Sequence, residues 1–141
     1  MMKTILALAV CLAFLLLGLW HFNMARKPFG STNSAVPSVD GKPLFVPSRA
    51  ATVAVGVVLI LFALLVAATS GLLVLDLPAQ WLRWASAALA AGLLARAVGD
   101  FRYVGFFKKV RGSAFARMDT LAYSPLCLAL SAGVAALAWW P

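Results

Sequence analysis

Four apolar runs, separated by polar segments, set the pattern of this chain. They cover residues 4–21, 50–75, 80–98 and 120–140, and none holds more than two charged residues. A helix rises about 1.5 Å per residue, so runs of this length approach or exceed the hydrocarbon core of a bilayer, which is about 30 Å thick. The pattern therefore predicts an all-α, polytopic integral membrane protein, with four transmembrane helices in a small bundle and a single domain over residues 1–141.

The polar segment between the first two runs, residues 22–49, does not have the composition of a helix. It contains four prolines, each of which lacks an N–H donor and pushes the residue before it toward an extended conformation: Pro28, Pro37, Pro43 and Pro47. We expect an ordered loop here, with at most a short hairpin. Its turn would lie at residues 39–42, because Asp40 and Gly41 tolerate a positive φ.

Small residues recur four apart in the third and fourth runs. The pairs are Ala88 with Gly92 and Ala129 with Gly133. This spacing lets helix backbones approach closely and marks contacts between helices. We expect the Ala88–Gly92 pair to pack within the chain, and a seam between two copies is the alternative.

The composition explains where so much apolar surface can go. Hydrophobic residues make up 64% of the 141 residues and charged residues only 11%, whereas about a quarter of a soluble domain is charged. A soluble fold of this size could not bury that much apolar surface, so lipid must cover it. The net charge of +8 on an apolar chain favours anionic lipid headgroups as partners. No basic soluble face or motif typical of nucleic-acid binding is found.

Positive charge is distributed unevenly between the two ends of the predicted bundle. Four spans place both termini and the turn at 76–80 at one end, and loops 22–49 and 99–119 at the other. Most cations lie in or next to those two loops: Arg26, Lys27, Lys42, Arg49, Arg96, Arg102, Lys108, Lys109, Arg111 and Arg117. Cytoplasmic loops are rich in Lys and Arg, so we expect both loops in the cytoplasm, both termini outside, and the protein in the inner (cytoplasmic) membrane. Four tryptophans would then anchor the outer interface: Trp81, Trp84, Trp139 and Trp140.

Residues 101–111 show a helical amphipathic pattern. At 100° per residue, Tyr103, Phe106, Phe107 and Val110 fall in one sector, and the cations fall outside it. The pattern predicts a short interfacial helix between the third and fourth spans, with its rings at the acyl boundary and its cations toward phosphate. The predicted lipid- or anion-binding set is Arg96, Arg102, Tyr103, Phe106, Phe107, Lys108, Lys109, Arg111 and Arg117. The alternative is a connector whose charges only set the topology.

A group of polar residues is expected at the cytoplasmic mouth of the bundle. Arg96 and Asp100 are four apart, so they can pair if the helix continues. Asp119 precedes Thr120 and suits a helix N-cap, and we expect the last helix to pass Pro125 with a kink rather than begin there. If the protein is an enzyme, its acid–base candidates are His21, Asp100, Asp119 and Tyr123, placed around an anion site at Arg96.

The sequence carries no motif for metal, cofactor or nucleophilic chemistry. One His and two Cys cannot make a zinc site with the usual ligand count, so no metal and no cofactor is predicted. No Gly-rich phosphate loop and no nucleophile with a recognisable base is present. Cys11 and Cys127, each within an apolar run, fit buried small hydrophobic residues better than a redox pair.

Two segments resemble a known family. The sequence R-A-V-G-D-F-R-Y-V-G-F-F-K-K-V-R-G-S-A-F-A-R-M-D-T-L-A-Y-S-P-L-C-L, from Arg96, is similar to the C-terminal signature of small bacterial membrane proteins known as domain of unknown function 3995. The sequence A-V-P-S-V-D-G-K-P-L-F-V-P, from Ala35, resembles the first-loop signature, and His21 also fits. After His21, N-M-A-R-K-P-F-G replaces the aromatic and Gly-rich residues of the family. The resemblance implies a four-helix membrane protein without an established activity.

Three classes of function follow from these observations. The first is a non-enzymatic lipid-binding or assembly module, or an accessory subunit of a larger membrane complex, whose basic aromatic loop is the contact surface. The second is a membrane-embedded enzyme acting on a lipid-soluble substrate, and the third is a small oligomeric transporter or channel. The missing catalytic motifs favour the first. Its expected partners are anionic membrane lipids, with other membrane-protein subunits or a second copy of the chain as further partners.

Overall fold

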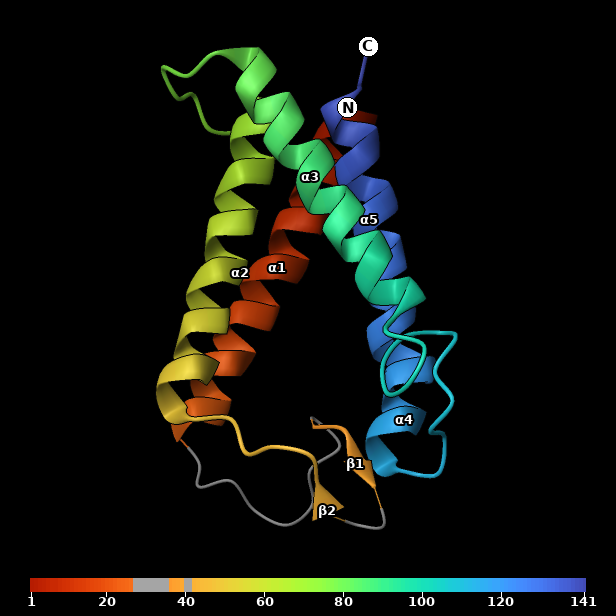
Figure 1. Cartoon of the computed structure of the whole chain (residues 1–141). Helices are drawn as coiled ribbons and strands as arrows, with labels where there is room; N and C mark the ends of the chain where they lie inside the picture. The colour runs from red at the N-terminus through yellow and green to blue at the C-terminus, as the bar shows by residue number, and fades with distance from the viewer. Residues whose placement is uncertain (27–35, 40–41) are drawn as a thin grey trace.

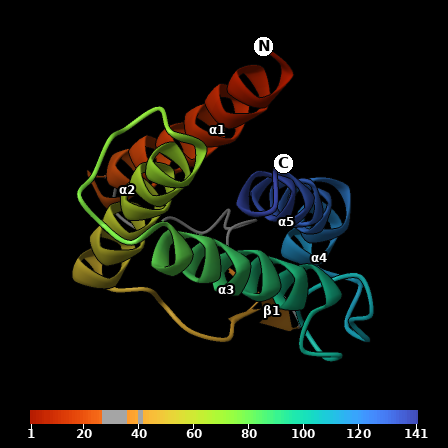
Figure 2. The ribbon, with the colours of Figure 1, turned by 90° about the horizontal axis from the view of Figure 1, so that it is seen from above.

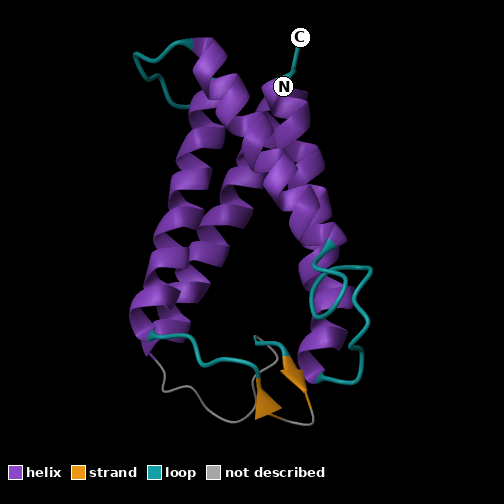
Figure 3. Ribbon diagram, in the orientation of Figure 1, coloured by secondary structure: helices purple, strands orange, loops and turns teal. Residues whose placement is uncertain are grey.

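The fold consists mainly of helices (Figure 1, Figure 3). The computed structural model describes residues 1–26, 36–39 and 42–141. In chain order the helices are α1 (Met2–Arg26), α2 (Arg49–Ser70), α3 (Ala79–Val98), α4 (Ala114–Met118), the π-helical turn η1 (Asp119–Tyr123) and α5 (Ser124–Ala138). A long helix therefore forms in each of the four predicted runs, with boundaries that shift by several residues.

A two-stranded hairpin lies in the loop between α1 and α2. Strands β1 (Ser38–Val39) and β2 (Lys42–Pro43) pair antiparallel, with Ser38 opposite Pro43 and Val39 opposite Lys42. The sequence predicted at most a short hairpin in this loop, and these two-residue strands agree with that limit. Its turn, at Asp40 and Gly41, lies outside the described residues, as does the part of the loop at 27–35.

The helices pack as two pairs. Helix α1 lies along α2, and α3 lies along α5 (Figure 1, Figure 2). The two pairs converge at the end where both termini and the α2–α3 connection lie, and diverge toward the end with the hairpin and the α3–α4 loop (Figure 1). The predicted grouping of both termini with the turn near residue 76, opposite the two basic loops, is therefore the arrangement of the fold.

The first pair packs closely at two glycines. A Cβ on Gly56 of α2 would lie 2.6 Å from the Phe22 ring and 3.1 Å from the carbonyl oxygen of Gly18, both on α1. Beside this contact, the rings of Phe14 and Phe62 meet edge to face at 5.8 Å. Only residues without a bulky side chain permit this approach.

The small-residue pairs of the later helices behave differently from each other. Gly133 of α5 is buried, and a Cβ there would lie 2.9 Å from the Val10 side chain. Ala88 and Gly92 are exposed, and nothing lies within 4 Å of a Cβ placed on Gly92. The prediction that Ala88 and Gly92 pack within the chain is therefore wrong, because α3 turns the opposite side toward α5.

Helix α2 ends earlier than its apolar run. Gly71 adopts a left-handed conformation with φ 84°, and its N–H donates to the Ala68 carbonyl at 3.2 Å. The N–H of Leu73 then donates to the Ala67 carbonyl at 3.0 Å. Helices commonly end at a glycine in the left-handed conformation, so the predicted end at residue 75 is five residues too late.

Within the part of the chain that the structure describes, three helical segments are long and apolar enough to cross a membrane: Met2–Arg26, Arg49–Ser70 and Ala114–Ala138. The third is continuous through α4, η1 and α5. Helix α3, which carries Arg83 and Arg96, is not among them. Many large apolar side chains on α1 and α2 are exposed. These features indicate a membrane protein.

Candidate functional site

A buried carboxylate lies at the junction of α3, η1 and the α3–α4 loop. The Asp119 side chain has no exposed surface, and its Oδ1 accepts a hydrogen bond from Arg96 Nη2 at 2.8 Å. Its Oδ2 accepts from Lys108 Nζ at 3.0 Å and from the Gly105 N–H at 2.7 Å. A carboxylate buried in this way must be paired, because leaving it alone in a low dielectric costs several kcal/mol. We call Arg96, Lys108 and Asp119 the ion cluster.

Lys108 is buried with this carboxylate. Only 2% of the residue is exposed, and besides Asp119 its ammonium donates to the Gly105 carbonyl at 2.9 Å and to Thr120 Oγ1 at 2.7 Å. All three ammonium donors are therefore satisfied. The prediction that Lys108 points outward to lipid phosphate is wrong, because Asp119, which lies eleven residues later, draws it inward.

The chain reaches Asp119 through an irregular helix. Helix α4 begins after Ser113, whose Oγ accepts a hydrogen bond from the Ala116 N–H at 3.0 Å. Ser113, rather than Asp119, is therefore the N-cap, and the cap predicted at Asp119 is wrong. The helix widens to π geometry at η1, where the Ser124 N–H donates to the Asp119 carbonyl, and then passes Pro125 into α5. The prediction that the helix does not begin at Pro125 is confirmed, and such π segments are frequent at functional sites.

Residues 99–113, which we call the basic loop, are not helical. Asp100 Oδ1 accepts hydrogen bonds from the backbone N–H groups of Arg102, Tyr103 and Val104, at 2.9, 2.7 and 2.9 Å. Gly99 and Gly105 have φ of 97° and 88°. These left-handed glycines bring the two ends of the turn into contact. The interfacial helix predicted over residues 101–111 is therefore not formed, and Asp100 caps a turn instead of pairing with Arg96.

The outer side of the basic loop combines rings and cations. Phe101 and Phe107 are 58% and 61% exposed, and their ring centroids lie 6.3 Å apart. The Arg102 guanidinium lies 5.1 Å from the Tyr103 ring centroid. Lys109 and Arg117 are exposed, while the Arg111 Nε donates to the Lys108 carbonyl at 3.2 Å. Of the predicted lipid- or anion-binding residues, Lys108 and Arg96 belong to the ion cluster, and the others lie on or next to this outer side, where Phe106 is partly exposed.

The acid–base candidates are not gathered into one site. His21 donates from Nδ1 to the Leu17 carbonyl at 2.8 Å on its own helix, and that helix belongs to the other pair (Figure 1). Asp100 is exposed and holds its turn, and Asp119 is held by the ion cluster. The Tyr123 ring lies 6.0 Å from the Phe115 ring. The arrangement thus gives Asp100 and Asp119 structural roles.

Two buried polar side-chain atoms have no hydrogen-bond partner within the described ranges. They are Arg96 Nη1 and Ser124 Oγ. The ion cluster itself carries one positive charge in excess, from two cations and one carboxylate. No group of three or more His, Cys, Asp or Glu side chains suited to a metal ion occurs among residues 1–26, 36–39 and 42–141.

Asp100 gives a prediction of pH dependence. Desolvation alone would raise its pKa, but the hydrogen bonds from Val104, Arg102 and Tyr103 outweigh it and hold the pKa below the ordinary value of 3.8. A carboxyl with a lowered folded-state pKa stabilises the fold above its unfolded pKa and loses that contribution as the pH falls through the folded value. We expect Asp100→Asn to flatten the acid limb of a plot of unfolding free energy against pH. Identical acid limbs for wild type and Asp100→Asn would contradict this role.

The fold and site define a helical membrane protein with a buried ion cluster beneath a basic aromatic loop. The chain matches the family described as Protein of unknown function (DUF3995) over residues 12–134, and it belongs to that family. The family resemblance noted in the sequence is therefore confirmed. No curated protein and no solved structure matches the chain.

Proposed function

We propose that this protein is a non-enzymatic membrane module that binds anionic phospholipid headgroups through its basic loop at the cytoplasmic face of the inner membrane. One observation carries the proposal. The basic loop displays exposed rings and cations on a backbone that the buried ion cluster holds from beneath. The rings suit the acyl boundary, and the cations suit the phosphate layer above it.

The proposal requires α3 to cross the membrane as a fourth span. Its 20 residues reach about 30 Å, which matches the hydrocarbon core. Its two arginines lie near opposite ends, where a long side chain can reach the interface or a counter-ion. Arg96 has such a counter-ion in Asp119. With α3 across the membrane, both loops rich in Lys and Arg would lie on one side, and the distribution of positive charge favours the cytoplasm for that side.

The internal hydrogen bonds of the basic loop favour lipid binding because they reduce the conformational entropy that the loop loses when it binds. A loop that must order itself on a ligand loses part of the interaction energy. Here the Asp100 turn and the contact of Gly105 with Asp119 already fix the backbone. Each exposed cation near an anionic surface then contributes about 1 kcal/mol, a contribution that salt weakens.

The enzyme alternative has less support, because the structure does not bring its four candidates together. Association with other membrane-protein subunits, or with a second copy, stays a prediction.

The proposal is tested by a fluorescent probe at Gly112. This position is exposed and open, so Gly112→Cys can be labelled in a background with Cys11→Ala and Cys127→Ala. We expect short-chain phosphatidylglycerol, but not phosphatidylcholine, to shift the emission of the probe in a salt-dependent titration. Arg102→Gln/Lys109→Gln/Arg117→Gln removes three cations that hold no described ion pair, and should weaken the apparent affinity by roughly 100-fold at about 1 kcal/mol per cation.

The matched control is Lys3→Gln/Arg83→Gln, which removes two cations at the other end of the bundle. The loop probe should respond to phosphatidylglycerol in this variant as it does in the wild type. An equal response to both lipids, or an unchanged affinity in the triple variant, would contradict the proposal.

A further inference from the structure

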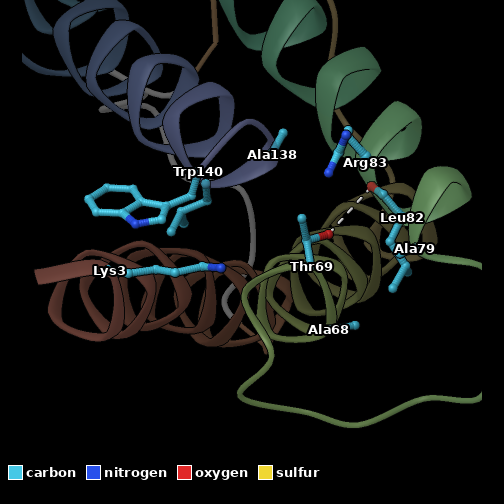
Figure 4. Close-up of a pocket in the computed structure, with 9 residues that line it drawn as sticks. Lys3, Ala68, Thr69, Ala79, Leu82, Arg83, Ala138 and Trp140 are labelled. Atoms are coloured by element: carbon cyan, nitrogen blue, oxygen red, sulfur yellow. Dashed lines mark hydrogen bonds between the residues drawn. The ribbon is translucent and has the colours of Figure 1, made fainter. Parts of the chain in front are cut away.

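A pocket of about 140 Å³, drawn in Figure 4, is lined by residues at the end of the bundle that holds both termini. The basic loop lies at the other end (Figure 1). Four parts of the chain contribute to the pocket: Lys3 comes from α1, Thr69 from α2, Arg83 from α3, and Trp140 follows α5. Ala68 and Leu137 add apolar wall. The pocket therefore forms only when both helix pairs are assembled.

The polar lining of this pocket is strongly biased toward positive charge. Figure 4 shows the Lys3 ammonium and the Arg83 guanidinium on either side of the space next to the Thr69 hydroxyl. None of the described residues that line the pocket is acidic. Both described ion pairs go to Asp119 at the opposite end of the bundle, so neither Lys3 nor Arg83 has a carboxylate partner among the described residues. Two like charges that face one space repel each other, and an anion between them removes that repulsion.

Neighbouring groups fix the geometry of the pocket. The guanidinium carbon of Arg83 lies 5.3 Å from the Trp139 ring centroid, and Trp84 meets Trp139 edge to face at 5.8 Å. Thr69 Oγ1 lies 2.8 Å from Ser86 Oγ, which holds the hydroxyl toward α3. Helix α3 begins at the pocket with Ala79, without a side-chain cap and without an acidic residue in its first turn, so its dipole adds to the positive potential.

We infer that this pocket binds a phosphate group. Its volume exceeds the roughly 30 Å³ that one water occupies in the liquid, and a phosphate can accept hydrogen bonds from Lys3 and Arg83 together. The surrounding tryptophans are typical of the level of the lipid headgroups. The phosphate therefore comes from a phospholipid of the leaflet at this end, or from free phosphate in solution. The inference is independent of the basic loop, which lies at the other end.

The experiment measures binding of phosphatidylglycerol to the intact protein by native mass spectrometry from detergent. The reference protein is Arg102→Gln/Lys109→Gln/Arg117→Gln, and the quantity followed is the affinity of its tightest phosphatidylglycerol adduct. Adding Lys3→Gln/Arg83→Gln to this background should lower that affinity by at least about tenfold, because two charged hydrogen bonds are lost. Arg26→Gln/Lys42→Gln, which removes the same charge at the loop end, should leave that adduct unchanged. Lys3→Arg/Arg83→Lys keeps both cations and should also retain it, which separates loss of the site from loss of folding.

A competition with inorganic phosphate distinguishes the two sources. If phosphate displaces the adduct at millimolar concentration, the pocket accepts the free anion; if it does not, lipid is the ligand, and either result supports a phosphate site. An equal adduct in the wild type and in Lys3→Gln/Arg83→Gln overturns the inference, and so does an equal loss in Arg26→Gln/Lys42→Gln. The Gly112 probe reports on the basic loop separately, so failure of this inference and failure of the proposed function give different results.

Discussion

Replacing Asp119 with Asn should lower the free energy of unfolding by about 3–5 kcal/mol, the cost of breaking a buried ion pair by removal of one partner. Lys108 would stay buried without its counter-ion. If the side-chain NH₂ of the new Asn took the place of Oδ2, a hydrogen-bond donor would face two other donors, the Lys108 ammonium and the Gly105 N–H. This is the largest effect that we expect from a single substitution in this protein.

Unfolding in mixed micelles, followed by steric trapping or by titration with dodecyl sulfate, measures this loss. Asp76→Asn is the matched control, because Asp76 is exposed and belongs to no described ion pair. Its stability should match that of the wild type within about 0.5 kcal/mol. Equal stability of Asp119→Asn and Asp76→Asn would show that the ion cluster does not hold the fold.

Gly105→Ala should be the second most damaging single change, with a loss of about 2–3 kcal/mol. Gly105 has φ 88°, a conformation that costs a residue with a side chain roughly 1–3 kcal/mol. An added Cβ would also collide with the backbone of Gly99 and Val98. Because the Gly105 N–H donates to Asp119, the turn and the ion cluster would both be disturbed.

Gly112→Ala provides the comparison within the same loop. Nothing lies within 4 Å of a Cβ placed there, and its φ is outside the left-handed region. We therefore expect Gly112→Ala to unfold as the wild type does, and Gly105→Ala to unfold earlier and to become more sensitive to proteolysis between α3 and α4. If both alanine variants behaved alike, the tight turn between Gly99 and Gly105 would not be required for stability.

The helices were predictable because an apolar run long enough to span a bilayer leaves few other structures open to the chain. The hairpin and the passage of the last helix through Pro125 follow from equally local chemistry. The Gly71 cap is a local signal too, since glycine is common at helix C-termini, but the apolar residues that follow it conceal the helix end.

The ion cluster could not be predicted by the same reasoning. Arg96 and Asp119 are 23 residues apart, and a residue at the start of an apolar run suits an N-cap just as well as a buried counter-ion. Periodicity placed Lys108 on a polar helical face, whereas the glycines at 99 and 105 turn the backbone away from a helix. The burial of Lys108 depends on tertiary contacts, and the tight approach of Gly18 to Gly56 does so as well.

The proposed membrane orientation depends most on helix α3. It is the least hydrophobic of the four long helices, and its two arginines contribute to this, yet it connects the two ends of the bundle (Figure 1). The proposed crossing of the membrane by α3 would put the basic loop and the proposed phosphate pocket on opposite sides. The packing of α3 against α5 and the salt bridge from Arg96 support such a crossing.

Single cysteines at Val74 and Gly112 test this crossing directly. Val74 is 90% exposed in the α2–α3 connection, and Gly112 lies in the basic loop. Each cysteine is introduced into the protein that carries Cys11→Ala and Cys127→Ala. In intact spheroplasts, a membrane-impermeant maleimide should label Val74→Cys but not Gly112→Cys. It should label Gly112→Cys only after the membrane has been permeabilised. Labelling of both positions from the outside, or of Gly112→Cys alone, would contradict the four-span orientation with a cytoplasmic basic loop.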